Sequence, residues 1–201
     1  MLVHKTISSL KEEAKSSLTG KWIFAAGITL LFFVATMLTQ IVPSQLFLIP
    51  FVIAPIFKYG YALVMLRLSR GEKVTFEMLF EGFSNRFGTI FFAGLVIIIR
   101  TILWSLLFII PGIIAAYSYS QTFFILADNK DITALDSIEE SKKIMKGSKW
   151  RFFLLSLSFI GWVILSLLTL GVGFFFLEPY CMVAYAKFYE SITLKHKSHQ
   201  E

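Results

Sequence analysis

Three ionisable residues, Lys58, Arg100 and Glu178, lie inside long apolar runs of this sequence. A charged side chain at the centre of a bilayer costs roughly 2.5–3.5 kcal/mol on insertion scales, so each is a candidate for a functional site. Arg100 and Glu178 lie at compatible depths in their runs, which predicts a buried salt bridge between two helical hairpins. Two alternatives stay open: the three side chains line a polar cavity suited to an anionic lipid headgroup or solute, or Lys58 snorkels to an interface.

No catalytic or metal motif accompanies these charges. The sequence has no Ser-His-Asp set, HExxH motif, Walker loop or carboxylate cluster of catalytic spacing. His196 and His199 have i, i+3 spacing, but two histidines near the C-terminus make a weak metal site. The single cysteine, Cys181, excludes an intrachain disulfide. We therefore expect no cofactor and no metal, and a non-enzymatic protein is favoured.

The elements that must position these residues are membrane-spanning helices. Hydrophobic residues make up 56% of the 201 residues and charged residues 16%, whereas soluble domains contain roughly 25% charged residues. A span needs about 20 apolar residues, and six such runs occur: 22–42, 46–66, 88–110, 111–127, 152–169 and 171–190. The pattern predicts an all-α polytopic membrane helical bundle, with six transmembrane helices as three hairpins in one integral membrane domain over residues 1–201.

The basic residues predict the topology. All of the 19 lysines and arginines except Lys58 and Arg100 lie in the segments before the first, third and fifth runs or towards the C-terminus. The short turns around 43–45, 111–112 and 171–173 contain none. Because Lys and Arg stay in the cytoplasm during insertion, both termini are expected there, in a multi-pass protein of the cell membrane. A kink at Pro111 would make 88–127 one long helix, but it would overshoot the bilayer about twofold, so two spans are favoured.

A short amphipathic helix is expected before each hairpin, lying in the inner interface with its apolar face towards lipid. The first helix is predicted from a Ser9/Glu12 capping box and an apolar face made of Ile7, Leu10, Ala14 and Leu18. The second is predicted from Thr75 as N-cap and an apolar face made of Phe76, Leu79, Phe80 and Phe83. The third is predicted from a Thr133/Asp136 capping box, a Glu139–Lys143 pair and a helix end at Gly147. The charged face of 131–149 is most simply solvated, with a protein-docking surface as the alternative.

This order of elements predicts an internal repeat with units near 6–67, 75–128 and 133–192. An aromatic residue marks the start of each hairpin, and the pattern P-x4-[GA]-Y-[AS] occurs once in each return run. The residues concerned are Trp22, Phe87 and Trp150 for the first marker, and Pro55/Tyr61, Pro111/Tyr117 and Pro179/Tyr185 for the second. The repeat predicts approximate threefold symmetry with the return helices packed inward.

Small and aromatic residues of the return runs suggest how those helices pack. Gly112, Ala116 and Ser120 form a small-residue face suited to close helix packing. The repeat tyrosines could line a cavity, but an interfacial aromatic belt is favoured for Tyr61, Tyr185 and Tyr189. The net charge of +6 is not arranged as a basic stripe with interleaved aromatics, so nucleic acid is not an expected partner.

Several segments resemble a known family. They are Ile110–Asp128, Ser141–Trp150, Ser158–Trp162, Leu170–Gly173 and Pro179–Tyr189. Together they are similar to the bacterial integral membrane family catalogued as domain of unknown function 975, and the resemblance covers nearly the whole chain. The resemblance implies a protein of the bacterial cytoplasmic membrane and no particular activity. A looser similarity is to the membrane domain of some glycerophosphodiester phosphodiesterases, whose catalytic barrel this chain lacks.

The first hypothesis is a non-enzymatic accessory, regulatory or protective factor of the cell envelope. Its partners would be membrane lipids and a protein that docks on 131–149. The alternative is a small transporter or binder of an anionic lipid or solute, using a midplane polar cavity at Lys58, Arg100 and Glu178. An intramembrane enzyme is disfavoured because no nucleophile has a base beside it in any recognisable motif.

Overall fold

The computed structural model describes residues 5–40, 49–84 and 86–197, and within these ranges all regular structure is helical. Each long helix coincides with an apolar run. In chain order the elements are α1 (Ile7–Leu18), α2 (Trp22–Gln40), α3 (Ile49–Ser69), the 3-10 helix η2 (Phe76–Phe83), α4 (Phe87–Leu107), α5 (Ile109–Tyr119), α6 (Thr122–Asp128), α7 (Ala134–Ile144), α8 (Lys149–Leu157), α9 (Ile160–Leu168) and α10 (Phe174–Lys197). The aromatic markers Trp22, Phe87 and Trp150 are the first or second residues of α2, α4 and α8.

Four helical segments of the described chain are long and apolar enough to cross a membrane. They are Pro50–Ser69, Phe87–Leu106, Ile109–Asp128 and Lys149–Leu168. A fifth candidate is the pair Ile7–Leu18 and Trp22–Leu38, which is bent by 96°. The prediction of an all-α chain with helices able to span a membrane is therefore confirmed, whereas the count of six spans stays a prediction.

The second hairpin turns three residues earlier than expected. Phe108 has extended backbone angles (φ −161°, ψ 147°) and separates α4 from α5. Pro111 lies in the first turn of α5, where its missing N–H leaves no helical hydrogen bond unmade. A Cβ on Gly112 would lie 2.8 Å from the Cα of Ser105, so the two helices approach closely across this turn. The run 88–127 thus folds back on itself as α4 followed by α5 and α6, and the turn predicted at Pro111-Gly112 lies at Phe108.

The first amphipathic helix begins one turn before the predicted cap. The Ser9 N–H donates to Thr6 Oγ1 at 3.2 Å, so Thr6 is the N-cap and the Ser9/Glu12 capping box is wrong. Thr6 satisfies a free N–H of the first turn, as N-cap side chains do. The apolar face centred on Ala14 is fully buried, and α1 packs along α10 and α3. This face therefore covers protein rather than lipid.

The second amphipathic segment is a 3-10 helix, and Thr75 makes no side-chain capping bond. Its backbone at Leu79 packs directly on Gly60 of α3. This tertiary contact, rather than α-helical spacing, determines the path of η2. Phe80 and Phe83 remain about half exposed, although both rings contact Phe57.

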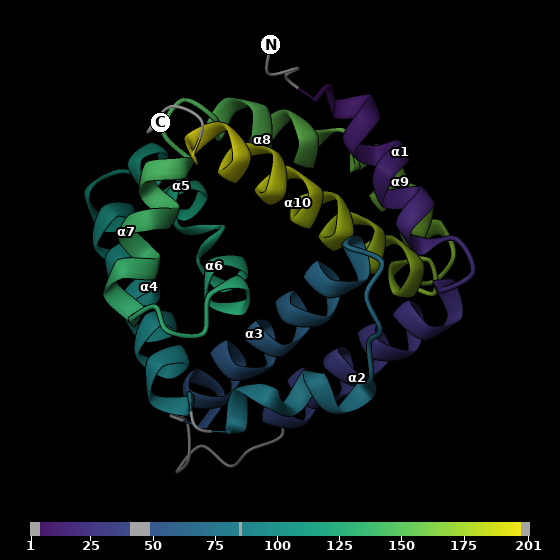
Figure 1. Ribbon diagram of the computed structural model, residues 1–201, viewed down its shortest axis with the longest axis horizontal. Coiled ribbons are helices and arrows are strands. Elements are labelled where there is room, and N and C mark those ends of the chain that lie inside the picture. Colours follow the sequence, from purple (N-terminus) through teal and green to yellow (C-terminus); the bar gives the residue numbers. More distant parts are fainter. Residues whose placement is uncertain (1–4, 41–48, 85, 198–201) are drawn as a thin grey trace.

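The capping box of the third amphipathic segment is confirmed. The Asp136 N–H donates to Thr133 Oγ1 at 3.2 Å, and the Thr133 hydroxyl donates to the Asp136 carboxylate at 2.6 Å. Gly147 has φ +78°, a left-handed conformation suited to the residue after a helix end. Figure 1 shows α7 alongside α4, and its apolar face is buried against α4, α5 and α6. The apolar face of this helix is therefore covered by protein rather than lipid, and its position at the membrane interface stays a prediction.

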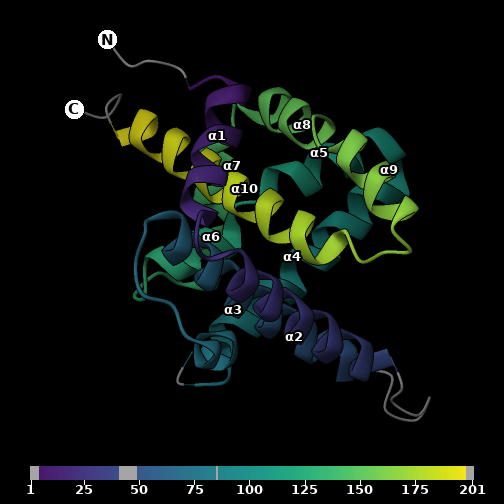
Figure 2. The same ribbon diagram turned by 90° about the vertical axis from the view of Figure 1, so that its right-hand side faces the viewer.

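Helix α3 lies at the centre of the helix packing. It contacts α1, α2, η2, α4, α6 and α10, and nearly all side chains between Tyr59 and Leu68 are buried. Figure 2 shows the α2–α3 pair at one end of the molecule and α8–α9 towards the other, with α10 between them. The return helices α6 and α10 both pack on α3, which is the inward packing expected of them.

Candidate functional site

Arg100 and Glu178 are not brought together. Arg100 instead donates to the Glu139 carboxylate on α7 at 2.9 Å. This hydrogen bond, with the charge of Lys142, holds the pKa of the Glu139 carboxyl below its usual value. Glu139 lies 3.6 Å from Lys142, and the predicted pair with Lys143 does not form. The expected salt bridge between Arg100 and Glu178 is wrong because α7 lies along α4 and offers a nearer carboxylate.

Lys58 and Glu178 act on each other electrostatically between α3 and α10. Among the described residues no ion pair within 4 Å joins them. The Lys58 ammonium lies 5.4 Å from the centre of the Phe123 ring on α6. Lys58 is exposed and Glu178 partly buried, and the two opposite charges interact without a direct ion-pair contact. Of the three residues predicted to form one site, Lys58 and Glu178 interact with each other, whereas Arg100 binds Glu139 on α7.

The repeat tyrosines are packed inside the protein. Tyr61 is 2% exposed, shares a 3.0 Å hydrogen bond with Thr29 and stacks on Phe32. Tyr117 and Tyr185 both contact the ring of Phe152, at 5.8 and 4.9 Å between centroids. Two of the three tyrosines thus meet at one aromatic residue of α8.

The interfacial belt expected for Tyr61, Tyr185 and Tyr189 is wrong for the first and last, which are buried. The repeat prolines have separate surroundings: Pro55 packs on Gly94 of α4, whereas Pro179 is buried within α10. The small-residue face of the second return helix is also discontinuous, because Gly112, Ala116 and Ser120 are buried, exposed and partly exposed respectively.

A charge cluster not foreseen from the sequence joins the three return helices. Arg70, just after α3, donates to Asp128 at the end of α6 (2.6 Å) and to Glu190 of α10 (3.0 Å). The Tyr189 hydroxyl donates to the same Asp128 carboxylate at 3.0 Å, and Lys187 lies 3.2 Å from Glu190. A signal was present in the sequence, because these opposite charges all lie near the ends of the three return runs.

Helix α7 also supports a break in the helix pair α5–α6. The Gln121 N–H donates to Ser141 Oγ at 3.2 Å, and the Ser141 hydroxyl donates to the Ser118 carbonyl at 2.8 Å. All three residues are at least nine-tenths buried. Broken helices are tolerated at membrane depth only where protein or water satisfies the freed backbone groups. Ser141 does this here, so α7 is an integral part of the bundle.

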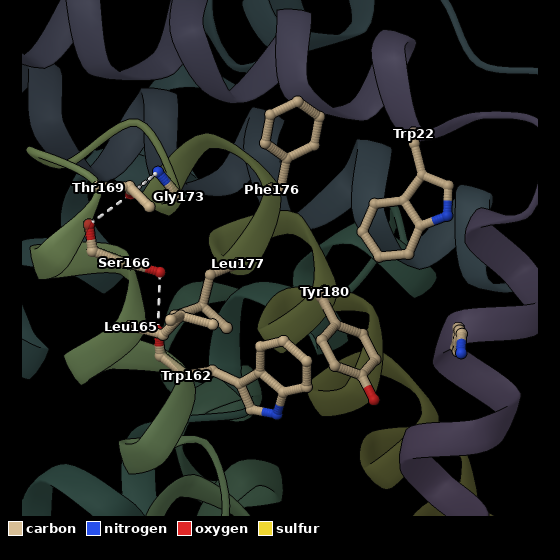
Figure 3. Close-up of a pocket in the computed structure, with 10 residues that line it drawn as sticks. Trp22, Trp162, Leu165, Ser166, Thr169, Gly173, Phe176, Leu177 and Tyr180 are labelled. Atoms are coloured by element: carbon tan, nitrogen blue, oxygen red, sulfur yellow. Dashed lines mark hydrogen bonds between the residues drawn. The ribbon is translucent and has the colours of Figure 1, made fainter.

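An apolar groove of about 410 Å³ lies between the start of α2, helix α9 and helix α10, with Lys15 of α1 on its lining. Figure 3 shows the rings of Trp22, Tyr180 and Trp162 towards one end, with Thr169 and Gly173 towards the other. The hydroxyls of Ser166 and Thr169 are bonded to backbone carbonyls, so that end offers a ligand no free donor. The remaining lining is made of apolar side chains such as Leu165, Phe176 and Leu177.

A second hollow of about 370 Å³ adjoins this groove and shares Lys15 and Tyr180 with it. Most of its lining surface is apolar, but the polar side chains of Ser8, Lys11 and Glu12 of α1 contribute to it. The Lys11 ammonium donates to the Ser158 carbonyl at 3.1 Å and lies 4.7 Å from the Phe159 ring centre. Lys15 has no salt bridge among the described residues. We call the apolar groove the shaft and the hollow lined by these charged side chains of α1 the mouth.

Metal ligands are not grouped in the part of the chain that the structure describes, where no three His, Cys, Asp or Glu side chains gather suitably. His199, one of the two histidines of the predicted weak metal site, lies outside the described residues.

One family model matches the chain, over residues 1–118 and again over residues 106–196. Its description is Protein of unknown function (DUF975), which confirms the family resemblance noted in the sequence. No curated protein and no solved structure matches the chain. The match establishes family membership and assigns no activity.

Proposed function

The chain belongs to the DUF975 family, and from that premise we propose that it is a non-enzymatic multi-pass protein of the bacterial cell membrane that binds a membrane amphiphile. The carrying observation is that the mouth, which is lined by the charged side chains of α1, is continuous with the apolar shaft at Lys15 and Tyr180. Ligand pockets are mostly apolar, with a few polar groups that fix orientation. An amphiphile satisfies both regions at once, with its chain in the shaft and its head at the mouth.

In this proposal the chain spans the membrane six times, with both termini in the cytoplasm and three repeated units. A short helix precedes each pair of proposed spans: α1 precedes α2 and α3, η2 precedes α4 and α5–α6, and α7 precedes α8–α9 and α10. The cluster at Arg70 joins the ends of the return helices α3 and α6 to α10. Figures 1 and 2 place the start of α1 and the end of α10 on the same side of the molecule. These features support the topology that the basic residues predict.

The envelope role we propose is that of an accessory, regulatory or protective factor that combines lipid binding with a protein partner. The outer face of α7 supports this because Leu135 and Lys143 remain exposed while the inner face is docked. Segment 131–149 is therefore the proposed protein-docking surface.

Filling the shaft is expected to abolish amphiphile binding. In Leu165→Trp the larger ring occupies the shaft, because Leu165 lines it. Crosslinking to a phosphatidylglycerol with a diazirine in its acyl chain, in nanodiscs, should fall at least fivefold at α9 and α10. The matched control is Leu167→Trp on the same helix, whose side chain is exposed and lines neither cavity. Equal crosslinking in both variants would sink the proposal.

A transporter is the second candidate. It is favoured by the exposed Lys58, which lies near the middle of the Pro50–Ser69 segment and interacts electrostatically with Glu178. A lysine facing hydrocarbon at that depth would cost several kcal/mol, roughly 2.5–3.5 on insertion scales. Single cysteines at 58, 100 and 178 in a Cys181→Ala background are to be treated with a membrane-impermeant thiol reagent. Transport requires labelling at 58 and 178, whereas protection of both in the folded protein removes this candidate.

A further inference from the structure

We infer that the groove selects a phospholipid with a net negative head, whose phosphate lies at Lys15 and whose acyl chain runs along the shaft. This inference rests on the proposed function and adds the chemical class of the ligand. It commits to a lipid rather than free phosphate, because the larger part of the site is apolar and a free anion would leave it unfilled.

The charge at the mouth favours an anion. Lys11 and Lys15 line it together with Glu12, which leaves one net positive charge. The Lys11 ammonium is held by the Ser158 carbonyl and the Phe159 ring, neither of which neutralises it. Lys15 has no salt bridge among the described residues, so its donors are available. Hydrogen bonds between an ammonium and a phosphate are about twice as strong as neutral ones.

Glu12 further restricts which phospholipid head groups suit the mouth. It lies one turn before Lys15 on α1, lines the same mouth and has no salt bridge among the described residues. An ionised carboxylate only accepts hydrogen bonds. A head group that carries a donor beyond its phosphate therefore suits this mouth, as the glycerol hydroxyls of phosphatidylglycerol do. Phosphatidylcholine offers no such donor.

The aromatic rings provide the competing possibility. Trp22 and Tyr180 lie 6.1 Å apart between ring centroids, and Trp162 lines the same shaft. Aromatic groups of this kind bind quaternary ammonium ions through cation–π contacts. The two lysines at the mouth oppose that ligand, so the inference predicts that phosphatidylglycerol is preferred over phosphatidylcholine. The opposite preference would show that the rings, not Lys15, select the head.

The test is competition against a fluorescent phosphatidylglycerol bound to the purified full chain in detergent, with phosphatidylglycerol or phosphatidylcholine as competitor. The wild type should prefer phosphatidylglycerol by about tenfold, the size expected of a charge-assisted hydrogen bond. Lys15→Gln should reduce that preference to about twofold and leave competition by phosphatidylcholine unchanged. Lys21→Gln is the matched control, because Lys21 lies nearby and lines neither the shaft nor the mouth.

The outcomes separate the two proposals. If Lys15→Gln keeps the full preference while Leu165→Trp loses all binding, the lipid-binding function stands and the assignment of the phosphate to Lys15 is wrong. If Leu165→Trp binds both lipids as the wild type does, the groove is not the binding site and both proposals fail. Lys15 is exposed, so its replacement should not prevent folding, and thermal unfolding of each variant provides that check.

Discussion

Replacing Gly60 by alanine is expected to lower the free energy of unfolding by about 3 kcal/mol, the upper end of the usual cost of overpacking a core. A Cβ at this position would lie 2.0 Å from the Leu79 carbonyl oxygen of η2. That atom belongs to the backbone, so the clash is relieved only if η2 moves away from α3. The movement would also separate the rings of Phe57 and Phe80, which lie 5.7 Å apart between centroids.

Reversible unfolding in mixed detergent micelles measures this loss. Gly161→Ala is the matched control, because Gly161 lies in helix α9 and a Cβ there would meet nothing within 4 Å. Alanine favours a helix over glycine by up to about 1 kcal/mol, so this variant should be neutral or slightly stabilised. Similar unfolding midpoints for the two variants would mean that η2 does not pack on Gly60 in the membrane protein.

The second large effect is expected at Arg70. Arg70→Ala removes the hydrogen bonds to Asp128 and Glu190 and leaves two carboxylates that lie near each other without the cation between them. Breaking a well-buried ion pair costs about 3–5 kcal/mol. Because these side chains are 20–32% exposed, we expect a loss of about 2 kcal/mol, after allowance for partial screening by water.

Two further variants test whether the lost ion pairs cause the loss of stability in Arg70→Ala. Arg70→Lys keeps the charge but lacks the planar fork that reaches both carboxylates, so it should recover only part of the lost stability. Lys130→Ala is the control at an exposed pair, since Lys130 lies 3.1 Å from Glu81 with 59% of its side chain exposed. Such surface pairs contribute about 0–1 kcal/mol. If Arg70→Ala and Lys130→Ala cost the same, the cluster does not hold the return helices together.

Both predictions concern contacts of helix α3, one on its face at Gly60 and one just beyond its end at Arg70. Gly60 lets the backbone of η2 approach one face, and Arg70 joins the end of the helix to α6 and α10. Loss of either contact should loosen the bundle without touching the shaft or the mouth. Stability and lipid selection can therefore be measured independently in this protein.

Local pattern determined most of the helices of this protein, although not the 3-10 conformation of η2. The apolar runs became helices, and the Thr133/Asp136 capping box and the left-handed Gly147 are present as predicted. Where a predicted helix end was wrong, it was displaced by only a few residues: the N-cap of α1 is Thr6 instead of Ser9. The reason is that helix formation and capping depend on residues within about four positions of each other, and that spacing can be read from the chain.

Only the tertiary structure decided which elements meet. Arg100 pairs with Glu139, 39 positions away, and Arg70 pairs with Glu190, 120 positions away. The depth of a residue in its helix follows from its position in the run, but the rotation of that helix and its neighbours does not. For this reason the sequence could not show that Lys58 interacts with Glu178 while Arg100 pairs with Glu139. The groove at Lys15 depends on the same long-range packing, since it forms where α1, α2, α9 and α10 come together.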